Sequence, residues 1–64
     1  MDRLEITYDI VKEATEGVED IYEEYIIKLV GQEGLELLLE NDLLEDRGAY
    51  EGKQMYSICE WKED

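Results

Sequence analysis

Carboxylates are the chemistry-bearing side chains that recur at regular spacing in this chain. A row with steps of three or four residues runs through its first half: Asp9, Glu13, Glu16, Asp20, and Glu23 or Glu24. On a helix this spacing places one charge per turn of ~5.4 Å. A second row through Glu5 and Glu19 would reduce the spacing to ~2.7 Å per charge, near the ~3.4 Å per charge of one DNA strand. The pattern predicts a rigid surface that presents carboxylates at nearly the density of phosphates.

A solvated helix face is the simpler explanation for such a row, because every amphipathic helix has one. An ordinary face, however, alternates Lys with Glu at a separation of four residues. Between residues 4 and 27 the sequence contains a single cation, Lys12. Repulsion among like charges destabilises a small fold, so a function is expected to maintain this surface. The acidic row is therefore the first candidate for contact with a partner protein that has a basic surface.

The charge balance excludes several classes of partner. The chain has 64 residues with 19 acids and 6 bases, a net charge of −13, spread over both halves. Nucleic acids and anionic membranes repel such a surface, since Lys and Arg supply the affinity for phosphates. Direct binding to DNA, RNA or membranes is therefore not expected. The longest apolar runs are also far below the ~18 residues of a membrane span.

The composition includes few of the side chains that commonly serve in catalysis or cofactor binding. There is no histidine and only one cysteine, so a disulfide within one chain and a zinc site of Cys and His ligands are both excluded. Cys59 lacks an imidazole base and is interpreted as a small apolar residue on a strand. We expect no enzyme activity and no cofactor. A free thiol in a chain without a signal-peptide pattern favours the cytoplasm.

A calcium site is also not expected. Asn41, Asp42, Glu45 and Asp46 lie within six residues of one another. An EF-hand loop needs oxygen ligands at alternating positions, a central glycine and a glutamate at the twelfth position. This cluster lacks that register, so no metal ligands are assigned.

A helical apolar stripe predicts the elements of the first half. It comprises Leu4, Tyr8, Val11, Val18, Tyr22, Tyr25 and Leu29, with Thr15 at its one polar step. A second set widens it: Ile10, Ala14, Ile21 and Ile26. Gly17 interrupts the pattern, which predicts one kinked helix or two helices broken near residues 15–17. Residues 3–8 also alternate as in a strand, so a short strand followed by Asp9 as helix N-cap is the alternative.

Turn and strand signals organise the second half. Lys28 followed by Gly31 predicts a helix end, with a turn over residues 32–34. A second helical face then covers residues 35–41 and ends at Asn41 and Asp42. Residues 44–50 and 53–60 are expected to form a hairpin with its turn at Glu51 and Gly52. The expected fold is a single α+β domain over residues 1–64, rich in helix, with two or three helices and a C-terminal β-hairpin.

One apolar face of this hairpin is left without an obvious cover. The helices can cover one face of a two-stranded hairpin, but residues 55–61 are apolar on both. This face is either covered by an N-terminal strand, or it is a homodimer contact or a partner site. The aromatic and apolar residues proposed for a partner contact or a homodimer contact are Tyr50, Met55, Tyr56 and Trp61.

Helices followed by a hairpin resemble the winged-helix arrangement in layout over about the last 45 residues. The resemblance would put Leu35–Asn41 in the place of the recognition helix and Gly48–Lys53 at the wing tip. Reading DNA would require several Lys, Arg, Asn or Gln side chains on that helix. It carries Glu36, Glu40 and Asn41, with Glu33 just before it. No DNA-binding role is carried over.

Two functional hypotheses follow. The first is an inhibitor or modulator that docks on a basic, nucleic-acid-binding surface by charge mimicry. In size and acidity the chain is similar in type to the small proteins with which phages and plasmids block host defence or transcription enzymes, including restriction and CRISPR nucleases. The second is a homo-oligomeric or accessory subunit whose acidity serves solubility and whose hairpin face is the contact.

Overall fold

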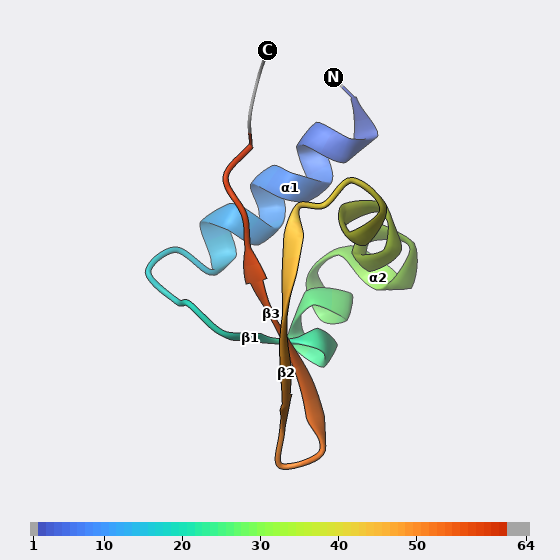
Figure 1. Ribbon diagram of the computed structural model, residues 1–64. Helices are drawn as coiled ribbons and strands as arrows, with labels where there is room; N and C mark the ends of the chain where they lie inside the picture. Colours follow the sequence, from blue (N-terminus) through green and yellow to red (C-terminus); the bar gives the residue numbers. More distant parts are fainter. Residues whose placement is uncertain (1, 62–64) are drawn as a thin grey trace.

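Two helices pack against a three-stranded antiparallel sheet in the computed structural model, which describes residues 2–61 (Figure 1). The elements in chain order are α1 (Arg3–Ala14), β1 (Ile21–Tyr22), α2 (Glu23–Glu40), β2 (Leu44–Tyr50) and β3 (Lys53–Ile58). The strands lie in the order β1-β3-β2, so β3 is central. This arrangement confirms the expected helix-rich α+β class. Within residues 2–61, no helix combines the length and apolar content needed to cross a membrane.

Helix α1 starts at Arg3 because Asp2 caps it. The Asp2 Oδ1 atom accepts a hydrogen bond of 3.3 Å from the backbone N–H of Leu4. The alternative of a strand over residues 3–8 is therefore wrong. At the other end Thr15 Oγ1 donates 2.7 Å to the carbonyl of Val11, and Gly17 takes a positive φ of 83°. The predicted break at residues 15–17 is confirmed, and the chain leaves the helix there.

Helix α2 contains one non-helical residue, Gly31, with φ 80° and ψ 171°. The predicted glycine interruption is present, but the predicted turn over residues 32–34 is wrong because the helix resumes directly at Gln32. Gly34 lies buried where α2 meets α1. A Cβ at Gly34 would lie 3.3 Å from Thr7 Cγ2 and 2.6 Å from Val30 Cβ. Its lack of a side chain therefore allows the close approach of the two helices.

The C-terminal hairpin pairs residues 44–50 with 53–58. Glu51 and Gly52 both have positive φ angles, 53° and 80°, as a two-residue type I′ turn requires. The predicted turn is confirmed, and β3 ends two residues before the predicted position, at Ile58. The tip of the hairpin extends well beyond the helices (Figure 1). Helices followed by this hairpin give the layout expected from the winged-helix resemblance.

Strand β1 was not predicted, and it changes which residues form the core. Ile21 pairs with Tyr56 and Tyr22 with Met55. The buried apolar residues are Tyr8, Val11, Ile21, Ile26, Leu35, Leu38, Leu43, Leu44 and Tyr56. Of the second predicted set, Ile21 and Ile26 are buried, whereas Ile10 and Ala14 are exposed. The first stripe is correct for α1 and for Leu29, which packs against the core, but it is wrong between Thr15 and Leu29 because the break resets the helical phase. Val18, Tyr22 and Tyr25 are consequently exposed.

Candidate functional site

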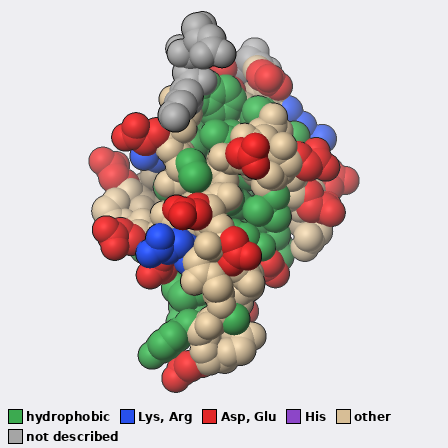
Figure 2. All heavy atoms as spheres, viewed as in Figure 1, with side chains coloured by type: hydrophobic (Ala, Val, Ile, Leu, Met, Phe, Trp, Pro, Cys, Tyr) green, Lys and Arg blue, Asp and Glu red, His purple; other side chains and the backbone are tan. Residues whose placement is uncertain are grey.

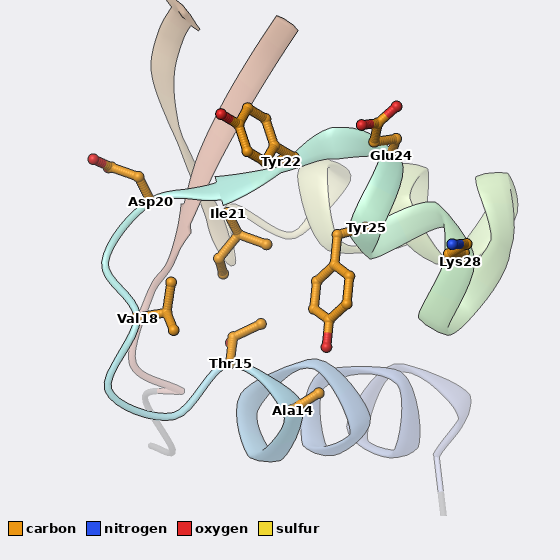
Figure 3. A pocket seen from close by; sticks show the side chains of 9 residues that line it. All are labelled: Ala14, Thr15, Val18, Asp20, Ile21, Tyr22, Glu24, Tyr25 and Lys28. Carbon is orange, nitrogen blue, oxygen red and sulfur yellow. The ribbon is translucent and has the colours of Figure 1, made fainter.

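A groove opens where the end of α1 meets β1 and the first turns of α2 (Figure 3). Its volume is about 560 Å³, and we call it the Val18 groove. Its lining residues are Ala14, Thr15, Val18, Asp20, Ile21, Tyr22, Glu24, Tyr25 and Lys28. In Figure 3 the side chains of Val18, Ile21 and Tyr25 point into a common space above Thr15. Helices and strand together thus build an open, mainly apolar hollow.

The groove combines fixed and accessible parts. Ile21 and Thr15 are each 3% exposed and belong to the packed interior. The side walls are accessible, since Val18 is 53% and Tyr25 43% exposed. Ile6 and Ile10, at 42% and 43% exposure, precede Ala14 at four-residue spacing and lie on the same side of α1. Accessible apolar side chains in one connected region are typical of contact surfaces.

Two ion pairs hold the charged rim of the groove. Arg47 Nε lies 3.0 Å from Asp20 Oδ1, and Lys53 Nζ lies 3.1 Å from Glu24 Oε1. The same Lys53 ammonium lies 5.6 Å from the centroid of the Tyr22 ring, within the range of a cation–π interaction. Both cations come from the hairpin, so these contacts join the rim to β2 and β3.

The structure does not place the predicted acidic row on one helix. Asp9 and Glu13 lie on α1, and Glu16 lies in the turn that follows. Asp20 immediately precedes β1, and Glu23 and Glu24 are the first residues of α2. The carboxylates are therefore regularly spaced along a helix axis only as far as the end of α1. The later members also serve the fold, because Asp20 and Glu24 form the rim ion pairs and Glu23 Oε2 accepts 3.3 Å from the Tyr56 hydroxyl.

Asp9, Glu13 and Glu16 differ from those later members, and we call them the outer carboxylates. All three are exposed. In the part of the chain that the structure describes, the four ion pairs use Asp20, Glu24, Glu33 and Glu45 instead. Acidic side chains are spread over the face of the molecule drawn in Figure 2, with fewer basic ones among them. Within residues 2–61 none of the outer carboxylates forms an ion pair, and Lys12 is the one cation beside them in the sequence.

The four hairpin residues proposed for a contact do not form one surface. Tyr56 is buried in the core at 9% exposure, and Trp61 is half-buried against Tyr8. Met55 is half-buried opposite Tyr22, while Tyr50 is 60% exposed near the tip. Packing within the chain therefore accounts for two members of the set, and the predicted common face is divided.

Two titratable groups on the hairpin have shifted pKa values with clear causes. Hydrogen bonds from the Gly48 N–H at 2.7 Å and the Gln54 side chain at 2.6 Å lower the pKa of Asp46. Burial raises the pKa of Tyr56, and the neighbouring Glu23 carboxylate raises it further. The ionised Asp46 thus joins the two strands of the hairpin, and the neutral Tyr56 joins the hairpin to Glu23 of α2.

The groove itself was missed from the sequence because Val18, Tyr22 and Tyr25 continued the apolar stripe of a helix. Gly17 was the signal that could have indicated the groove. A helix break at Gly17 ends the helical periodicity, so the apolar residues after it need not lie on the buried face. Residues 2–61 include no group of three Asp, Glu or Cys side chains arranged to hold a metal ion. No family model matches the chain, and no curated protein or solved structure matches it significantly.

Proposed function

We propose that this protein is a non-enzymatic binding module that docks on a basic, nucleic-acid-binding surface of a target protein by charge mimicry. The observation that carries the proposal is the set of exposed outer carboxylates, Asp9, Glu13 and Glu16, outside the ion pairs of the described residues. Carboxylates along α1 and in the turn that follows it can meet Lys and Arg side chains that otherwise bind phosphates.

The overall charge supports the same mode of binding. A net charge of −13 on 64 residues creates a long-range field that attracts a basic surface and accelerates association. The same field opposes contact between two copies of this chain, which disfavours the homo-oligomeric alternative. Repulsion between Asp9 and Glu13, four residues apart on α1, lowers the stability of the fold by ~0.2–0.5 kcal/mol. Because the pair does not help folding, binding to a basic partner explains it better.

The proposed role is that of an inhibitor or modulator, of the type that phages and plasmids direct against host enzymes. It acts in the cytoplasm, where a half-buried free thiol such as Cys59 remains reduced. The protein would occupy the site of DNA or RNA on its target and block access without chemistry of its own.

Affinity capture with two matched variants tests this proposal. One variant carries Asp9→Asn, Glu13→Gln and Glu16→Gln; the control carries Glu36→Gln, Glu40→Gln and Asp42→Asn, which removes the same charge from the end of α2. Wild type and control should capture nucleic-acid-binding proteins at ~50 mM salt, and added duplex DNA or high salt should release them. The first variant should lose these proteins while circular dichroism shows an unchanged fold.

Three results separate the explanations. Equal loss in both variants would mean that total charge matters and the outer carboxylates have no special role. Retention by both would contradict charge mimicry. Captured proteins that DNA cannot displace would place the contact outside a nucleic-acid-binding surface.

A further inference from the structure

We propose that the Val18 groove receives an apolar side chain from a basic segment of the protein partner, a short stretch in which a residue such as Leu is flanked by Lys or Arg. This inference rests on the proposed function and names the part of the target that is recognised. The outer carboxylates attract the basic segment over a long range, whereas the groove packs around its apolar side chain.

The lining of the groove has the composition of a site for one apolar group. Ala14, Val18, Ile21 and Tyr25 are among its lining residues, and the buried Ile21 and Thr15 keep its floor in place. A volume of about 560 Å³ lies within the usual ~300–1,000 Å³ of small ligand sites. Covering Val18 and Tyr25 would remove apolar surface from water, which stabilises a complex.

The rim shows how cations would be held beside that apolar group. Lys53 lies between the Glu24 carboxylate and the Tyr22 ring, so the chain already uses this combination to bind an ammonium. Asp20 and Glu24 each use one carboxylate oxygen in an ion pair, and their side chains remain 45% and 70% exposed. A carboxylate has about four acceptor sites, so each can bind a further cation from a partner.

Charge selects this occupant over a second copy of the chain. Two copies would bring net charges of −13 together around the groove, whereas a basic segment is attracted by the same field. Lys28 is the one cation among the nine lining residues, and Asp20 and Glu24, although each is paired with a hairpin cation through one oxygen, keep their second oxygen for a partner. The groove therefore fits an apolar side chain that arrives with positive neighbours.

The test uses two short capped peptides of Lys and Arg that differ only at the centre, Leu in one and Ser in the other. Binding is followed by amide chemical shifts in wild type, Val18→Ser and the control Tyr50→Ser, which replaces an exposed residue near the hairpin tip. Wild type and Tyr50→Ser should bind the Leu peptide about tenfold more tightly than the Ser peptide, with shifts at residues 14–25. Val18→Ser should bind both peptides equally, and its spectrum should otherwise show the native fold.

The outcomes distinguish this inference from the proposed function. Equal affinity of wild type for both peptides, with shifts confined to residues 9–16, would overturn the groove proposal and leave charge-based docking intact. Failure of both peptides to bind at low salt would count against docking on basic surfaces. If a neutral peptide with the same Leu binds as tightly, the basic segment is the wrong occupant. Concentration-dependent dimers abolished by Val18→Ser would assign the groove to a second copy.

Discussion

The Tyr8 ring and the Trp61 indole meet edge to face, with centroids 5.3 Å apart and an interplanar angle of 64°. The Tyr8 hydroxyl completes the contact, since it donates 2.7 Å to the Cys59 carbonyl and accepts 3.1 Å from the Trp61 backbone N–H. One tyrosine thus holds the segment after β3 against α1. Trp61, proposed from the sequence as a partner contact, has a clear role within the fold.

Replacing Trp61 with Ser should lower the free energy of unfolding by about 2 kcal/mol. Both the edge-to-face contact and the apolar area covered on Tyr8 would be lost. Urea unfolding followed by circular dichroism measures the change. Tyr50→Ser is the matched control and should change stability by less than about 0.5 kcal/mol, because Tyr50 is 60% exposed. Equal effects of the two substitutions would contradict a structural role for Trp61.

Gly34→Ala should destabilise the protein although Ala favours helices. The new Cβ would lie 2.6 Å from Val30 Cβ and 3.3 Å from Thr7 Cγ2, closer than the helices tolerate. Overpacking costs ~1–3 kcal/mol, more than the ~1 kcal/mol gained in helix propensity. Thermal and urea unfolding of Gly34→Ala measure the loss. Adding Thr7→Ser, which removes the Cγ2 atom, should restore only part of the stability, because the closer Val30 Cβ remains. Full rescue by Thr7→Ser would show that Thr7 is the limiting neighbour.

Stability should rise between 20 mM and 500 mM salt. Because the chain has 19 acids and only 6 bases, repulsion between like charges exceeds attraction. Salt screens this repulsion, with a Debye length of ~10 Å at 0.1 M. Salt also weakens the four exposed ion pairs, but pairs of this kind contribute only ~0–1 kcal/mol each. Urea midpoints at several concentrations of sodium chloride test the balance. A constant or falling midpoint would show that the ion pairs outweigh the repulsion.

Alkaline pH should destabilise wild type more than Tyr56→Phe. Burial and the Glu23 carboxylate raise the pKa of Tyr56 in the folded state above its usual value of 10.0. A raised folded-state pKa contributes stability that is present below the unfolded-state pKa and is lost as pH rises through the folded-state value. Unfolding free energies between pH 8 and pH 11.5 should therefore fall more steeply for wild type. Parallel curves would mean that Tyr56 ionises equally easily in both states.

Local signals in the sequence were sufficient wherever neighbouring residues determine the backbone. Glu51 and Gly52 between two strand-forming runs specify the hairpin turn, because a two-residue type I′ turn needs positive φ at both positions. Gly17 and Gly31 likewise mark the two interruptions of helix, and Tyr8 and Val11 mark the buried face of α1. The acidic charge, which suggested the kind of partner, is also a property of the sequence itself.

Only the tertiary structure decided what depends on residues distant in the chain. Strand β1 has two residues and exists because Ile21 and Tyr22 pair with Tyr56 and Met55, more than thirty positions away. That pairing buries Ile21 and leaves Val18 and Tyr25 exposed, so the stripe that predicted a core instead supplies the walls of a groove. Trp61 packs on Tyr8 across the length of the sequence. A periodic pattern shows which residues share a face of an unbroken helix, but long-range pairing determines which of them the fold covers.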